Sequence, residues 1–71
     1  MLTKKEYKVV LLLTEGKFNK EIAEEMGISI YTVKNHLKNI YKKLEVRNRS
    51  EAIIKTHHKN FFKKQALEND V

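Results

Sequence analysis

The sequence has no cysteine and no proline, and only two of its 71 residues are glycine. Without cysteine, neither a disulfide framework nor a cysteine-ligated zinc site can stabilise the fold. The scarcity of proline and glycine removes the usual β-hairpin turns and favours helices. The longest apolar run, VVLLL at residues 9–13, is far shorter than the ~20 residues of a membrane span. These absences predict one small helical domain without a membrane segment, in the reducing cytoplasm.

Capping residues mark the first two helices. Thr3 and Glu6 have the spacing of a capping box, in which each side chain accepts a hydrogen bond from the other residue's backbone amide. Gly16 suits the left-handed conformation that ends the first helix. Asn19 is the expected N-cap of a second helix. We expect this second helix to be short and to stop at a tight turn at Gly27.

The third helix has the clearest pattern in the chain. Ser29 is its expected N-cap, and the helix is expected to end near Leu44. Apolar residues recur along it at steps of four, three and four, which places them on one side of the helix, as in a helix that packs on a core. The residues of this apolar stripe are Val33, Leu37, Ile40 and Leu44.

A fourth helix is expected from Asn48 or Ser50 to about Leu67, because no residue in that stretch breaks a helix. Residues 68–71 are expected to fray. The predicted architecture is therefore all-α, a compact four-helix bundle with a long C-terminal helix four, in a single domain of residues 1–67. The expected inner stripe of helix four consists of Ala52, Ile53 and Thr56.

Positive charge gathers on the third helix and the loop after it. Residues 30–49 contain six lysines and arginines against Glu45 alone, so they carry +5 of the net charge of +6. A short helix, a tight turn and a basic second helix are the arrangement of a helix-turn-helix, which places its second helix in the major groove of DNA. We therefore expect double-stranded DNA as the partner, bound with release of counterions. The outer face of the basic helix carries Tyr31, Asn35, Lys38 and Lys42, with Lys34 on its flank.

Spaced residues between Leu2 and about Thr56 match the pattern of one family of DNA-binding domains. These residues are Leu2-Thr3, Glu6, Gly16, Asn19-Lys20-Glu21-Ile22-Ala23, Ile28-Ser29, Thr32-Val33-Lys34, His36, Ile40, Lys43-Leu44, Val46, Arg49 and Ala52. On these residues the chain resembles the LuxR-type (GerE-type) helix-turn-helix family. This resemblance implies a transcriptional regulator that binds a two-fold related site as a homodimer, with helix three in the major groove. It also implies a dimer contact on helix four near Ala52, Ile53 and Thr56.

The resemblance further implies that Lys34, Asn35 and Lys38 reach base edges. Their chemistry agrees, because asparagine pairs with adenine in bidentate fashion and lysine suits the acceptors of guanine. RNA polymerase is a further candidate partner. The expected location is the cytoplasm, in association with the nucleoid. A second set of residues is expected to hold phosphates, which positions the protein without reading sequence. These residues are Lys20, Tyr31, Thr32, Lys42 and Lys43. For Tyr31 the alternative is that it only flanks the turn.

Two other functions fit parts of the sequence. A sigma-factor region that reads a promoter element has a similar core, EIA, then G-I-S, then T-V-K, but His36 and the loop from Val46 to Arg49 favour the LuxR type. A protein-interaction module could use helix four with Phe61 and Phe62 and would not need DNA.

No enzyme, metal or cofactor is expected. The chain shows no nucleophile and base pair, no glycine-rich phosphate loop and no paired carboxylates in a plausible cleft. His57 and His58 would point about 100° apart on a helix and lack further ligands at suitable spacing. Arg49 is expected to have a structural role, bonded to a carboxylate such as Glu6 or to helix-three carbonyls. Phe18 is expected either to staple onto helix two or to alter a phosphate contact.

Overall fold

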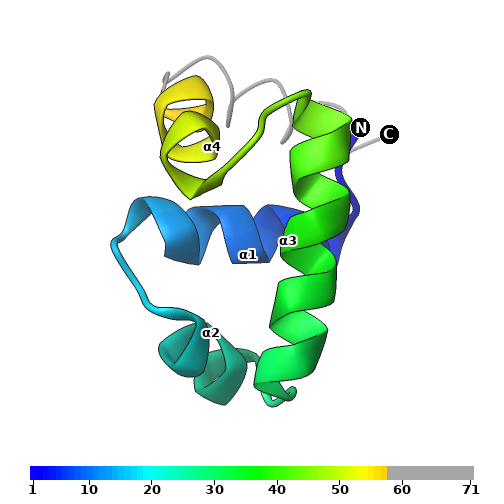
Figure 1. Ribbon diagram of the computed structural model, residues 1–71. Helices are drawn as coiled ribbons and strands as arrows, with labels where there is room; N and C mark the ends of the chain where they lie inside the picture. The colour runs from blue at the N-terminus through cyan, green and yellow to red at the C-terminus, as the bar shows by residue number, and fades with distance from the viewer. Residues whose placement is uncertain (58–71) are drawn as a thin grey trace.

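Four helices form the part of the chain that the computed structural model describes, residues 1–57 (Figure 1). They are α1 (Lys4–Thr14), α2 (Asn19–Met26), α3 (Ile30–Leu44) and α4 (Arg49–Thr56), with no strand in that span. The predicted all-α class and helix order are confirmed.

The capping box at the start of α1 is confirmed. Thr3 Oγ1 accepts from the Glu6 amide at 3.1 Å, and Glu6 Oε1 accepts from the Thr3 amide at 2.8 Å. Gly16 follows the helix with φ of 82°, in the region where an L-residue is disfavoured and glycine is not. Both ends of α1 are therefore set by the residues that the sequence indicates.

The start of α2 differs from the expectation. Asn19 is the first helical residue, and the N-cap position belongs to Phe18, whose side chain has no oxygen with which to cap. Glu21 compensates by accepting a hydrogen bond from the Phe18 amide at 2.8 Å. The Phe18 ring is 73 % exposed and so does not staple onto α2. The Asn19 side chain is instead free to bind another part of the fold.

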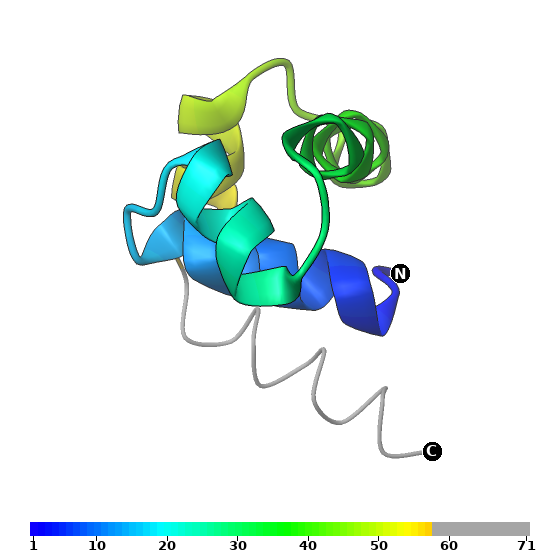
Figure 2. The same ribbon diagram turned by 90° about the horizontal axis from the view of Figure 1, so that it is seen from below.

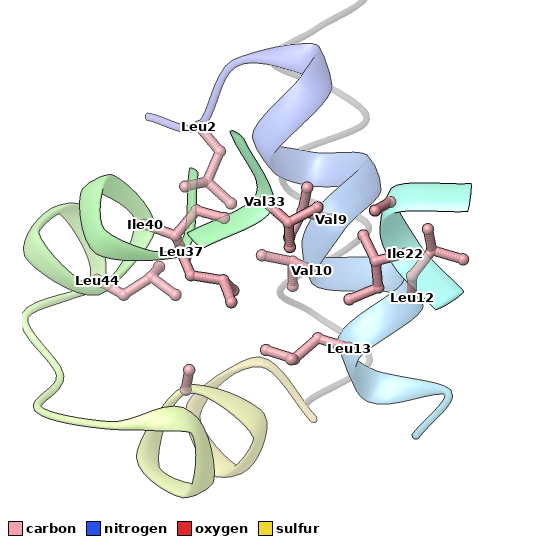
Figure 3. Packing of buried hydrophobic residues seen from close by; sticks show 12 residues of the cluster. Leu2, Val9, Val10, Leu12, Leu13, Ile22, Val33, Leu37, Ile40 and Leu44 are labelled. Atoms are coloured by element: carbon pink, nitrogen blue, oxygen red, sulfur yellow. The ribbon is translucent and has the colours of Figure 1, made fainter. Parts of the chain in front are cut away.

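The core lies between α1 and α3, with α2 and α4 closing its two ends (Figures 1 and 3). Figure 3 shows the side chains of α1 and α3 pointing toward one another, with Ile22 of α2 beside Leu12. All four residues of the predicted α3 stripe are buried, and Leu2 is buried ahead of the first helix. The buried residues from α1 are Val9, Val10, Leu12 and Leu13.

The start of the fourth helix agrees with the expectation. The Asn48 side chain caps it by accepting from the Glu51 amide at 2.9 Å, while the Glu51 carboxylate accepts from the Arg47 amide rather than from Asn48. The helix ends at Thr56, whose hydroxyl donates to the Ala52 carbonyl at 2.8 Å. The expected continuation to Leu67, with Phe61 and Phe62, and the tail 68–71 lie outside the described residues.

Candidate nucleic-acid interface

The basic face of α3 lies on the outside of the domain. In Figures 1 and 2, α3 forms one edge of the described fold, and the other three helices lie to one side of it. The helix therefore has a side that packs and a side that no other described helix covers. Val33 and Ile40 on the packed side are completely buried.

The uncovered side presents the predicted residues as one row. Tyr31, Asn35, Lys38 and Lys42 follow one another at steps of four, three and four, the same spacing as the buried stripe but on the opposite side of the helix. All four are exposed, and Lys34 is exposed on the flank. We call these four residues the outward row. Since α3 has no acidic residue, nothing on the helix itself neutralises the row.

The turn before α3 is rigidly built. Gly27 adopts φ of 67°, and the next amide, that of Ile28, returns to the Ala23 carbonyl at 3.0 Å, which closes the end of α2 in a Schellman-like arrangement. Ser29 then caps α3, as predicted, by accepting from the Thr32 amide at 3.0 Å. The two hydroxyls, Ser29 Oγ and Thr32 Oγ1, lie 2.9 Å apart and are hydrogen-bonded. Thr32 is therefore part of the cap as well as a candidate phosphate ligand.

Lys43 has a structural partner that the sequence analysis does not predict. Its ammonium lies 2.7 Å from the Glu6 carboxylate, in the single salt bridge formed among residues 1–57. Burial of Glu6 would raise its pKa, but hydrogen bonds from Lys43 and Thr3 outweigh burial and hold the pKa below its ordinary value. The carboxyl is thus ionised at neutral pH, and the charge of Lys43 is neutralised within the fold. The expected phosphate role of Lys43 stays a prediction, and a phosphate would have to compete with Glu6 for the ammonium.

Arg49 has the predicted structural role, with different partners. Its Nη1 donates to Asn19 Oδ1 at 3.0 Å, and its Nη2 donates to the Lys17 carbonyl. Neither Glu6 nor a helix-three carbonyl is bound. The guanidinium also opposes the rise in the pKa of Tyr41 that burial causes. Arg49 therefore ties α4 to the beginning of α2.

Lys55 makes the corresponding connection at the other end of the motif. Its ammonium donates to the Leu44 carbonyl, the last of α3, at 2.5 Å. A cation at this position satisfies a free carbonyl and interacts favourably with the negative end of the helix dipole. Through Arg49 and Lys55, α4 holds both helices of the helix-turn-helix.

The residues expected at a dimer contact are mostly unavailable to a partner. Ala52 and Thr56 are completely buried, and Ile53 packs against the core of its own chain. Ala52 and Thr56 therefore pack within their own chain, and the expected dimer contact at these two residues stays a prediction. The large apolar residue that α4 does expose is Ile54, at 70 %.

Residues 1–57 show neither a group of metal ligands nor a membrane-spanning helix. No three histidine, aspartate or glutamate side chains in this span are arranged to hold a metal ion, and His58 lies outside it. No helix of the described span has both the length and the apolar character needed to cross a membrane.

Comparison with known proteins identifies the family. Residues 1–56 match the family described as bacterial regulatory proteins, luxR family. The chain is 51 % identical over 53 residues to the transcriptional regulatory protein LiaR of Bacillus subtilis (strain 168), covering 75 % of this chain and 25 % of LiaR. It is 48 % identical over 54 residues to the response regulator protein VraR of Staphylococcus aureus (strain Mu3), covering 76 % of this chain and 26 % of VraR.

The fold agrees with a solved structure. The response regulator ChrA of a heme-sensing two-component system matches with a TM-score of 0.79 and 36 % identity, over 86 % of this chain and 30 % of that protein. The chain thus spans about a quarter of the length of the curated relatives it matches. On the family match and these relatives together, the chain belongs to the LuxR family of bacterial regulatory proteins.

Proposed function

We propose that this domain binds double-stranded DNA in a sequence-specific manner, with α3 in the major groove. The observation that carries this proposal is the outward row, an exposed and acid-free line of side chains at the edge of the domain. A helix that needed only to be soluble would mix charges of both signs on such a face. The opposite stripe is fully used in packing, so the row is free to contact a ligand.

Lys34, Asn35 and Lys38 are proposed to contact base edges. Asparagine reads adenine through two hydrogen bonds, and lysine reads the N7 and O6 acceptors of guanine. Lys20 and Lys42 are proposed to bind phosphates, which orient the domain without reading sequence. Thr32 can also bind a phosphate. When Ser29 is the donor in the hydrogen bond between the two hydroxyls, the hydroxyl proton of Thr32 is free to donate to a phosphate oxygen.

A salt titration tests the proposal. With Lys43 paired to Glu6, about five cations remain on and beside α3, which predicts a slope of log affinity against log salt near −4.5, from roughly −0.9 per phosphate. Lys42→Ala should weaken binding to every sequence and flatten the slope by about 1. Lys8→Ala, an exposed lysine of α1, is the matched control and should leave the slope unchanged. A slope near zero for the parent would remove DNA binding and favour a protein-interaction module.

We further propose that the domain binds DNA as a homodimer through the outer side of α4. The exposed Ile54 supports this contact, while Ala52 and Thr56 are used within the chain. Two half-sites about one helical turn apart, ~34 Å, would each take one domain. Tethering on DNA supplies a high effective concentration, so a weak contact between the subunits is sufficient.

Ile54→Glu separates this proposal from packing within the chain. Because Ile54 is exposed, the variant should remain folded, and its affinity for a single half-site should equal that of the parent. Its affinity for a paired site should fall by roughly tenfold or more, because the gain from two linked binding events is lost, as measured by sedimentation with each DNA. Equal affinity of parent and variant for the paired site would contradict the dimer.

Selection from random DNA adds an independent test, because an inverted repeat indicates a dimer and a single asymmetric element indicates a monomer of the sigma-factor kind.

A further inference from the structure

Tyr31 is the uncharged aromatic member of an otherwise polar and basic row. It occupies the first turn of α3 and is 73 % exposed. No hydrogen bond involves its hydroxyl within the span 1–57, and no hydrophobic neighbour covers its ring there. A side chain with this exposure contributes nothing to the core, so its role must be sought outside the fold.

The position of Tyr31 suits a base rather than a phosphate. Tyr31 stands four residues before Asn35, which is about 6 Å along a helix axis. That distance corresponds to between one and two base pairs, which are stacked ~3.4 Å apart along the DNA. Helical side chains lean toward the N-terminus of their helix, so the ring extends the row beyond Asn35. In helix-turn-helix proteins the N-terminal residues of the second helix are those that contact base edges.

The chemistry of the ring points the same way. An uncharged residue releases no counterion from the DNA, so it adds little to the affinity for DNA of any sequence. Apolar contact in the major groove distinguishes thymine, which is the base that carries a C5-methyl group there. An aromatic face presented beside Asn35 is therefore matched to that methyl group.

We propose that the Tyr31 ring packs against the C5-methyl group of a thymine one to two base pairs from the base contacted by Asn35. Tyr31 is then a residue that determines specificity, and not the phosphate ligand expected from the sequence. This inference rests on the proposed placement of α3 in the major groove.

The first measurement is selection from random DNA by the parent and by Tyr31→Ala. The two selected sequences should differ at one base pair, where the parent prefers thymine and the variant accepts several bases. Tyr31→Phe should keep the preference, because it retains the ring and loses the hydroxyl. Phe18→Ala is the matched control, since Phe18 is equally exposed but lies outside α3, and it should also keep the preference.

The second measurement replaces that thymine with uracil, which deletes the methyl group alone. Affinity of the parent should fall about fourfold, the effect of one buried methyl group. For Tyr31→Ala the same DNA change should have no effect, so the two changes are not additive in a double-mutant cycle. The salt slope should be the same for both proteins.

The outcomes separate this inference from the proposed function. If the parent shows no salt-dependent binding to DNA, both fail together. If the parent binds and selects a sequence but Tyr31→Ala selects the same one, the Tyr31 assignment alone is overturned. If Tyr31→Phe weakens binding to all sequences as much as Tyr31→Ala, the hydroxyl binds a phosphate and the thymine contact is refuted.

Discussion

Removing Lys43 should destabilise the domain even though the lysine is partly exposed. The Glu6 side chain is only 5 % exposed, and its Oε1 accepts both from Lys43 and from the Thr3 amide. Loss of one partner of a buried ion pair typically costs 3–5 kcal/mol. Water can reach the Lys43 side, which is 37 % exposed, so screening reduces this to about 2 kcal/mol for Lys43→Met.

Such a loss is large for this domain. At roughly 0.1 kcal/mol per residue, a chain of 71 residues is stable by only about 7 kcal/mol. For domains of this size, 1 kcal/mol corresponds to about 4–8 °C in melting temperature, so Lys43→Met should melt about 8–16 °C below the parent. Glu6→Gln should lose less, about 1 kcal/mol, because the amide oxygen can still accept from Thr3.

Thermal and urea unfolding of the parent, both single variants and the double variant would measure the pair directly. The double variant should lose less stability than the two single losses add up to. In Lys43→Met alone a buried carboxylate has lost its partner, whereas in the double variant Glu6→Gln has removed that carboxylate. Additive losses, each below 0.5 kcal/mol, would show that the pair has no part in holding the fold.

The pH dependence of the free energy of unfolding should also show the contribution of the Glu6 carboxylate. The pKa of Glu6 in the folded state lies below its ordinary value of 4.5, so the unfolded chain binds the proton more readily. The contribution of Glu6 is therefore complete above pH 4.5 and is lost as the pH falls through the lower, folded pKa. Glu6→Gln should flatten this part of the profile, and an unchanged profile would contradict the assignment.

Four further substitutions have definite expected results in unfolding experiments. Glu45 ends α3 with φ of 58°, so Glu45→Gly should raise the stability by about 0.5–1 kcal/mol, whereas Gly27→Ala, at φ of 67°, should lower it by about 1 kcal/mol. Ala52→Glu places a carboxyl in the core and should abolish the helical circular dichroism signal, unlike Ile54→Glu. Arg49→Ala should cost about 1–3 kcal/mol, because it releases α4 from the start of α2.

The features that the sequence predicts correctly are those encoded within one helical turn. Thr3 and Glu6 find each other three residues apart, Ser29 caps the helix that follows it, and Gly16 and Gly27 take the backbone conformations that glycine favours. The buried stripe of α3 is equally local, because its period follows from the geometry of the helix. Each of these patterns requires no knowledge of what the helix packs against.

Apart from the N-cap of α2, which is Phe18 and not Asn19, the features that the sequence does not predict depend on distant contacts. Glu6 and Lys43 are 37 residues apart, and Arg49 reaches Lys17 and Asn19 across more than half of the described chain. No local pattern indicates which charged side chains will meet. The sequence of α4, only eight residues long, also does not show which side of the helix packs on the core and which faces outward. Ala52 is therefore expected from the sequence both in the core and at a dimer contact.

The division of α3 into two rows has a consequence for how such domains change over generations. Val33, Leu37, Ile40 and Leu44 hold the helix in place whatever residues stand at positions 31, 35, 38 and 42. Substitutions in the outward row therefore meet almost no selection for folding. With the base contacts proposed above, duplicated copies of the domain would diverge toward new target sequences in single steps, with no compensating change in the core.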